Sequence, residues 1–162
     1  MKNLLMCMAT LQDKQAIALW PAYPEEFREL DYALRDNGWL DEFMGKENAW
    51  IYVAERDGVP VAFSLLAMGE ESEAEFRIAL HADYLGKGLG RVIARRTLEL
   101  GFHVHGLRRI HLIVRKNNHR ARKLYESMGF QPSGSCMKVV DGCRVEFQQF
   151  EYLHASVNPG RG

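Results

Sequence analysis

Residues 85–90 read Leu-Gly-Lys-Gly-Leu-Gly, and an apolar pattern at helical spacing follows directly. Three glycines in five positions let the backbone turn sharply and come close to a ligand. A helix that begins behind such a loop points its unpaired N–H groups at whatever the loop holds. The stretch therefore predicts an anion cradle, most often one for phosphate.

The loop lies between a predicted strand and a predicted helix. Residues 75–80 alternate as in a strand, and residues 92–102 place apolar side chains on one helical face. Two better-known phosphate motifs do not fit. The P-loop ending Gly-Lys-Ser/Thr is missing, and the glycine spacing differs from that of the dinucleotide fingerprint. A glycine-rich turn without a ligand is the alternative that the loop alone leaves open.

The remaining elements predict a mixed α+β fold. Asp57-Gly58 and Asp141-Gly142 predict hairpin turns, and Gly129 predicts a helix end. The strand–helix–strand order around the loop predicts a right-handed parallel unit in an otherwise antiparallel sheet. We expect strands at 3–9, 50–55, 59–68, 74–81, 110–114, 130–140 and 144–153, and helices from Asp13 to Trp20, from Pro24 to Gly38, from the loop to about residue 104, and from Asn117 to Met128.

Length and composition bound the class of protein. The chain has 162 residues, 47% apolar and 26% charged, which indicates one globular domain at 1–153 with a flexible tail at 154–162. The apolar run at residues 4–8 is too short to span a membrane and has no clear cleavage site behind it. We therefore expect a cytoplasmic protein.

The metal-ligating residue types show no convincing metal site. The three cysteines have no ligand spacing and are interpreted as reduced thiols. Cys136 and Cys143 either face each other across the last hairpin or are separate buried thiols. His103-x-His105 is interpreted as a pair of polar edge residues, so we expect no metal.

The net charge of zero conceals an asymmetry. Residues 1–85 carry 7 Lys/Arg and 16 Asp/Glu, whereas residues 86–123 carry 11 Lys/Arg and only Glu99 as an acid. A basic block that begins at the glycine loop suits a polyanionic ligand, and an acidic first half suits a cationic one. The alternative is that both are solvated faces whose charges merely balance.

A second motif lies on the last predicted helix and reads Asn118-x-x-Ala121-x-x-Leu124-Tyr125-x-x-x-Gly129-Phe130. Taken with the loop, residues 48–153 resemble the GNAT family of acetyl-CoA-dependent N-acetyltransferases, and look most like the spermidine and ribosomal-protein acetyltransferase branch. The resemblance implies the GNAT fold, a central mixed, mostly antiparallel sheet of six to seven strands flanked by about four helices.

The resemblance also implies acetyl-CoA as cosubstrate. The backbone amides of the loop would hold the pyrophosphate, and the strand before it would pair with the pantetheine arm. The family usually has Arg or Gln where this chain has Leu85, so a side-chain contact is lost or is replaced by Lys87. Asn118 either contacts the cofactor, caps its helix, or does both. The implied cofactor-binding residues are Ile78, Ala79, Leu80, Leu85, Gly86, Lys87, Gly88, Leu89, Gly90, Arg91 and Asn118.

Two catalytic residues follow from the same resemblance. Tyr125 matches the family's general acid, which protonates the leaving thiolate. The alternative for Tyr125 is an aromatic ring packed in the core. Glu75 is the candidate base, acting through water, against the alternative of an exposed strand carboxylate. Further candidates lie nearby at Glu70, Glu71 and Glu73.

The predicted function is N-acetyl transfer to a primary amine, either on a polyamine-like cationic molecule or at a protein N-terminus. The alternatives are a non-catalytic acyl-CoA sensor and an acetyltransferase acting on tRNA or an aminoglycoside. The basic block lacks interleaved aromatic residues, which argues against a nucleic-acid-binding protein. Four aromatic residues of the first half either line an acceptor cleft or pack in the core, and the family's habit suggests a homodimer. These four residues are Trp20, Tyr23, Trp39 and Trp50.

Overall fold

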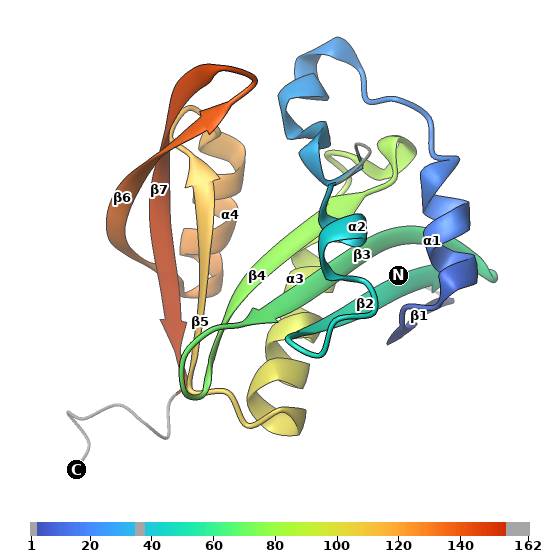
Figure 1. Ribbon diagram of the computed structural model, residues 1–162, viewed down its shortest axis with the longest axis horizontal. Helices are drawn as coiled ribbons and strands as arrows, with labels where there is room; N and C mark the ends of the chain where they lie inside the picture. Colours follow the sequence, from blue (N-terminus) through green and yellow to red (C-terminus); the bar gives the residue numbers. More distant parts are fainter. Residues whose placement is uncertain (1–2, 35–37, 155–162) are drawn as a thin grey trace. The chain divides into compact units, whose positions relative to one another are not determined.

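The computed structural model describes residues 3–34 and 38–154, which divide into two compact units. The first unit comprises Met1–Met68 and Arg77–Leu98, and the second comprises Gly69–Phe76 and Glu99–Gly162. The seven strands of the described residues are hydrogen-bonded in the order β1-β2-β3-β4-β5-β7-β6 (Figure 1). The mixed, mostly antiparallel sheet is confirmed. The predicted tail falls outside the described residues except for His154.

The first unit is built on a meander whose turn the sequence predicts. Strands β2 and β3 pair antiparallel through Asp57 (φ 53°) and Gly58 (φ 78°), the two positive values that a type I′ hairpin requires. Strand β1 pairs antiparallel with β2. The elements of this unit are β1 (Leu4–Met8), α1 (Leu11–Ala18), the 3-10 helix η1 (Glu25–Leu34), α2 (Trp39–Phe43), β2 (Ala49–Arg56), β3 (Val59–Met68), the 3-10 turn η2 (Ala82–Tyr84) and α3 (Leu89–Glu99). Strand β4 (Glu73–Leu80) is shared, because its residues up to Phe76 belong to the second unit.

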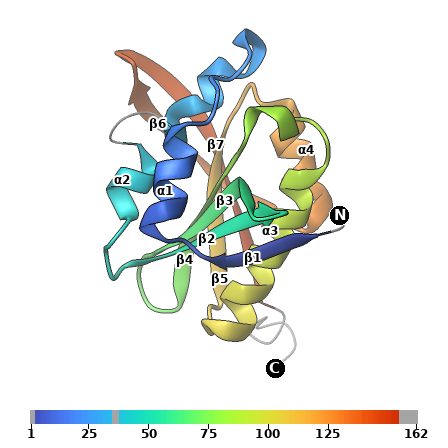
Figure 2. The same cartoon turned by 90° about the vertical axis from the view of Figure 1, so that its right-hand side faces the viewer.

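Helices cover both faces of these strands (Figure 2). On one face Ile17 of α1 and Phe43 of α2 pack with Phe63 of β3 and their neighbours. On the other face, Leu89 and Ile93 of α3 are fully buried in a cluster with strand residues. Burying strand side chains on both faces requires apolar residues at successive positions, which explains the apolar run of β3; its one polar member, the buried Ser64, is hydrogen-bonded to Thr97 of α3 at 2.7 Å.

The second unit is a hairpin sheet with one helix (Figure 1). Its β5 pairs parallel with the first residues of β4 and antiparallel with β7, and β7 pairs antiparallel with β6. The parallel strand–helix–strand unit is therefore confirmed. The elements that this unit introduces are the π-helical segment η3 (Leu100–Val104), β5 (Arg109–Arg115), α4 (His119–Met128), β6 (Gln131–Val140) and β7 (Cys143–Leu153).

Aromatic rings link the strands of the second unit to α4. The Tyr125 ring lies edge-on to Phe76 at 6.2 Å and to Phe130 at 5.5 Å, and Phe130 in turn contacts Tyr152. Gly129 ends α4 with φ 107°, and a Cβ there would come within 2.9 Å of the Tyr152 ring. Glycine is thus required for two reasons, and the predicted helix end is confirmed.

One predicted helix start is wrong, and two predicted helices differ in type. Thr10, not Asp13, is the N-cap of α1, and Asp13 is the other member of a capping box in which its carboxylate accepts from the Thr10 amide. The helix predicted from Pro24 is a 3-10 helix at 25–34, and its predicted end lies partly outside the described residues. The helix behind the loop changes from α to π geometry after Glu99.

Two other expectations need correction. The short helix α2 was not predicted, because five residues carry too little periodicity to show. Cys136 lies opposite Phe147 in the last hairpin, so it does not face Cys143. Cys143 is exposed and Cys136 is half-buried, so they are not a pair of buried thiols either.

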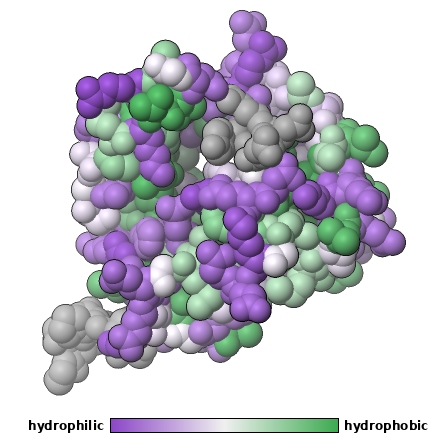
Figure 3. Space-filling view, in the orientation of Figure 1, coloured by the Kyte–Doolittle hydropathy of each residue, from purple (hydrophilic) through white to green (hydrophobic). Residues whose placement is uncertain are grey.

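Surface hydrophobic residues are scattered over several elements. On the face seen in Figure 3 they form separate patches among hydrophilic residues. Val139 on β6 is 71% exposed and Leu5 on β1 is 69% exposed, each near an edge of the strand order. Single exposed apolar residues of this kind are ordinary.

Candidate active site

The glycine loop has the backbone that its sequence predicts. Gly86 (φ 71°) and Gly88 (φ 85°) both adopt left-handed conformations, which other residues reach only at a cost. A Cβ at Gly88 would meet nothing within 4 Å, so the conformation, not crowding, explains this glycine. Helix α3 begins at Leu89, and its first N–H groups lack partners within the helix. There is therefore room for a ligand at Gly88, next to the N–H groups of the first turn of α3 that have no partner within the helix.

Neither backbone conformation nor crowding explains why position 90 is glycine. It lies in the first turn of α3 without a positive φ, and a Cβ there would make an ordinary contact of 3.8 Å with Leu80 Cδ1. Glycine costs a helix about 1 kcal/mol relative to alanine in the interior. A ligand that approaches the backbone closely at this position would explain the glycine.

The strand before the loop is anchored in the first unit. Ala79 is buried in one core cluster, while Ile78 and Leu80 pack against the other. The Leu80 carbonyl already accepts a hydrogen bond of 2.6 Å from the hydroxyl of Tyr23. Burial raises the pKa of Tyr23 to about 12, with a smaller contribution from Asp31, so this phenol is a donor at neutral pH.

Tyr125 lies on α4 in the second unit, with 7% of its surface exposed. Burial raises the pKa of its phenol above the ordinary value of 10. The ring contacts of Tyr125 show that it packs in the core. A protonated phenol is also what a general acid needs, so packing and proton donation are compatible.

Glu75 lies on the opposite face of β4 from Tyr125. Successive side chains of a strand alternate, and the next residue, Phe76, contacts the Tyr125 ring. Glu75 is in register with His111 of the parallel strand β5, and both are half-buried. Burial and the charge of Arg109 lower the pKa of His111, whereas Glu75, Glu73 and Glu151 act in the opposite direction. His111 is therefore mainly neutral at pH 7 and lies beside the candidate base.

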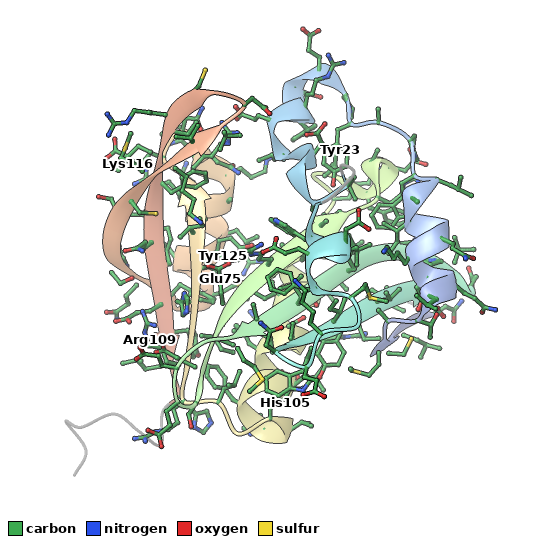
Figure 4. The ribbon with its side chains drawn as sticks, in the orientation of Figure 1. Tyr23, Glu75, His105, Arg109, Lys116 and Tyr125 are labelled. Atoms are coloured by element: carbon green, nitrogen blue, oxygen red, sulfur yellow. The ribbon has the colours of Figure 1, made fainter. Side chains whose placement is uncertain are left out.

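The other carboxylates differ from Glu75. Glu73 accepts from Arg109 at 3.2 Å, and the same guanidinium binds Glu151 at 2.7 Å (Figure 4 labels Arg109 and Glu75). Because its carboxylate is engaged by Arg109, Glu73 is less free to reach a substrate amine and is a weak candidate base. Glu70 and Glu71 are exposed in the turn before β4.

Asn118 caps α4. Its Oδ1 accepts from the amide of Ala121 at 3.2 Å, as the prediction of a cap required. The cap uses one lone pair of the side-chain oxygen and leaves the amide group for another partner. The structure therefore confirms the cap and does not exclude a second role for Asn118.

The candidate residues are divided between the two units. The first unit brings together the loop and the Ile78–Leu80 strand segment, and the second brings together Glu75, Asn118 and Tyr125. Sequence reasoning missed the Tyr23 hydrogen bond and the position of His111. The alternation of polar and apolar residues in β5 could have placed His111 on one face with Arg109, whereas nothing local signals Tyr23.

The aromatic residues of the first half are mostly engaged. The Arg77 guanidinium lies 5.3 Å from the centre of the Trp39 ring and 5.1 Å from that of Phe43, and it pairs with Glu42 at 3.5 Å. The chain's own cation therefore occupies the Trp39 face that a ligand ammonium would need. Trp20 packs against Phe63 and His81. These contacts therefore do not form a continuous aromatic cleft.

The described ranges contain neither a metal-binding cluster nor a membrane-spanning helix. No group of three or more His, Cys, Asp or Glu side chains in residues 3–34 and 38–154 is arranged to hold a metal ion. No helix in the same part of the chain is long and apolar enough to cross a membrane.

The amino-acid sequence is similar to those of known acetyltransferases. Over 95 residues the chain is 33% identical to the spermidine N(1)-acetyltransferase of Escherichia coli K12, covering 54% of this chain and 51% of that protein. It is 31% identical over 93 residues to the putative ribosomal protein bS18-alanine N-acetyltransferase of Bacillus subtilis, covering 57% of this chain and 61% of that protein. The chain thus spans about half the length of the curated relatives it matches.

Structural comparison extends the likeness to the whole fold. A chimera of the Vibrio cholerae spermidine N-acetyltransferase SpeG and hSSAT superposes with a TM-score of 0.77 and 21% identity, covering 96% of this chain and 98% of that one. At this identity the match shows the fold alone. The model of the acetyltransferase (GNAT) family, whose members use acetyl-CoA as acetyl donor, matches residues 14–130. The chain belongs to the acetyltransferase (GNAT) family.

Proposed function

We propose that this chain transfers an acetyl group from acetyl-CoA to the primary amine of a cationic, polyamine-like small molecule. The observation that carries the proposal is the loop at residues 85–90, where two left-handed glycines precede the N-terminus of α3 and a Cβ at Gly88 would meet nothing within 4 Å. Diphosphate is the anion that such a loop suits, and coenzyme A contains one.

The residues of the loop fit the cofactor. Backbone N–H groups from Leu85 to Arg91 would hold the pyrophosphate, and Lys87 and Arg91 add positive charge on exposed side chains. The Leu85 amide donates to the Ala82 carbonyl at 3.3 Å, so it could reach the pyrophosphate only by giving up or sharing this hydrogen bond. Acetyl-CoA supplies the acetyl group as a thioester, which the Ile78–Leu80 segment would orient through its backbone. Asn118 would add one side-chain contact.

The chain's own side chains would manage the protons. As the amine nitrogen bonds to the acetyl carbon and the carbon–sulfur bond breaks, the amine loses a proton and the sulfur gains one. Glu75 would accept the first proton through water. Tyr125 would donate the second, because its phenol is protonated at neutral pH. Burial raises the pKa of this phenol and makes it a weaker acid, so donation requires the thiolate sulfur directly beside the hydroxyl.

A cationic acceptor is supported by charge and by relatives. The 3-10 helix η1 begins with the exposed Glu25 and Glu26 and lies in the acidic first half of the chain. A surface of this sign attracts polycations and raises their rate of encounter. The similarity to spermidine acetyltransferases points the same way, although it covers half of each relative.

A panel of amines tests the proposal. The purified chain is mixed with acetyl-CoA and one amine at a time, and the release of free coenzyme A thiol is measured. We expect the highest kcat/KM for spermidine or spermine. The panel also contains an aminoglycoside, a peptide with an N-terminal alanine, and tRNA. Tight binding of coenzyme A without release from acetyl-CoA under any condition would instead indicate a sensor.

A second acceptor class has its own support. The likeness to a putative ribosomal-protein alanine acetyltransferase favours a protein N-terminus. Turnover of the N-terminal alanine peptide above that of polyamines would select this class. The homodimer and the cytoplasmic location stay predictions.

A further inference from the structure

One peptide group at the end of β4 is held from both sides. The His81 amide donates to the Val61 carbonyl of β3 at 2.8 Å, and the Leu80 carbonyl accepts from the Tyr23 hydroxyl at 2.6 Å. Both groups belong to the same peptide unit between Leu80 and His81. Tyr23 is 5% exposed and Leu80 is half-buried, so this hydrogen bond is partly protected from water.

The geometry of this peptide shows which side of β4 Tyr23 occupies. In a planar trans peptide the C=O and N–H groups point in opposite directions. Because the His81 amide points at β3, the Leu80 carbonyl points away from β3, towards the edge of β4 that is free within the first unit. Tyr23 reaches this edge at the residue where the strand ends (Figure 4).

The constraint continues from this peptide to the glycine loop. His81 Nδ1 accepts from the Asp83 amide at 3.0 Å, and the His81 carbonyl accepts from the Tyr84 amide at 2.9 Å. The Leu85 amide then donates to Ala82 at 3.3 Å. The segment between the clamped peptide and the loop therefore has little backbone freedom, so the orientation of the peptide fixes where the loop begins.

Tyr23 also connects the segment between α1 and η1 with the end of β4. It lies between α1 and the acidic η1, and Trp20 of the same segment contacts the His81 ring at 5.4 Å. The segment thus touches the end of β4 at two successive residues, Leu80 and His81.

We propose that Tyr23 is a positioning residue of the acetyl-CoA site: its hydroxyl sets the Leu80–His81 peptide, and through it the glycine loop, in the orientation that coenzyme A binding needs. The inference rests on the proposed function. It also narrows the predicted cofactor contacts. The Leu80 carbonyl is already paired, and the Ala79 backbone points towards β3 by strand alternation, so the carbonyl contact to pantetheine at the free edge falls to Ile78.

Tyr23→Phe tests the inference, because it removes one oxygen and keeps the ring. Isothermal titration with coenzyme A should show a Kd about 5–10-fold weaker than that of the wild type, the usual effect of one lost hydrogen bond. With the best amine of the panel, KM for acetyl-CoA should rise by a similar factor while kcat stays within about twofold. Amide hydrogen exchange should rise at residues 82–90 and stay unchanged in β2 and β3.

Tyr52→Phe is the matched control. Tyr52 is a buried tyrosine of β2, 6% exposed and outside the segment that leads to the loop. This control should leave the Kd for coenzyme A unchanged. An equal Kd for wild type and Tyr23→Phe, or a fall in kcat with no change in Kd, would overturn the positioning role. If the wild type binds no coenzyme A, the proposed function itself fails, and this inference fails with it.

Discussion

Replacing Gly90 by alanine should change stability and cofactor binding in opposite directions. Alanine is favoured over glycine by about 1 kcal/mol in a helix interior, and we expect about half to all of this in the first turn of α3. The new Cβ would lie 3.8 Å from Leu80 Cδ1, an ordinary contact without strain. For a chain of this size, 1 kcal/mol raises Tm by about 2–4 °C. The variant without ligand should therefore melt about 1–4 °C above the wild type.

Coenzyme A should reverse the order of the two proteins. At 100 times its Kd a ligand stabilises the fold by about 2.7 kcal/mol. If the methyl group blocks backbone approach and weakens binding tenfold, about 1.4 kcal/mol of that gain is lost. Thermal melts of both proteins with and without coenzyme A measure the two effects together. A coenzyme A shift that is equal in both proteins would refute the reasoning that a ligand explains this glycine.

Gly88→Ala serves as the comparison. Its φ of 85° is costly for alanine, about 1–2 kcal/mol, so this variant should melt below the wild type even without ligand. The two glycines of one loop thus separate backbone conformation from ligand approach.

Three further predictions concern the second unit. Tyr125→Phe should lower kcat at least ~10-fold, whereas Tyr152→Phe, another tyrosine of the same ring network, should not; equal rates for Tyr125→Phe and wild type would remove this phenol from the mechanism. Asn118→Ala should lower the free energy of unfolding by about 1 kcal/mol through loss of the cap. If Asn118 also contacts the cofactor, this variant should lose more coenzyme A affinity than Tyr152→Phe does. Because burial lowers the pKa of His111, the unfolded chain takes up a proton below about pH 6.5 that folded His111 does not. Stability should therefore fall on acidification from pH 7 to 5.5, and less so in His111→Gln; equal losses in urea melts would contradict this assignment.

Much of the fold could be predicted because its signals are local. The Asp-Gly pairs at 57–58 and 141–142 set both hairpins through their positive φ values, and Gly129 marks the end of α4. The glycine loop is likewise defined by its own backbone conformation. Each of these features depends on a few consecutive residues, so the sequence alone shows them.

The features that the sequence did not predict depend on contacts between residues far apart in the chain, or on a choice between two residues that could each play the same role. Thr10 and Asp13 are both good caps, and only the reciprocal hydrogen bonds of the capping box decide between them. The Tyr23 hydroxyl meets a carbonyl 57 residues away, which no local pattern encodes. The orientation of Glu75 relative to Tyr125 similarly depends on the register of β4 against β5 and on the packing of α4.

The alternation of side chains along β4 limits how this family member can evolve. Glu75 and Phe76 face opposite sides of the strand. Glu75 lies beside His111 of β5, and Phe76 contacts the Tyr125 ring. Inserting or deleting one residue before the glycine loop would exchange the two faces and put a carboxylate against the phenol. A change of length in the turn at 57–58 does not exchange the two faces of β4, and a Cβ at Gly58 would meet nothing within 4 Å. Length variation among homologues should therefore accumulate in that turn and be absent from β4.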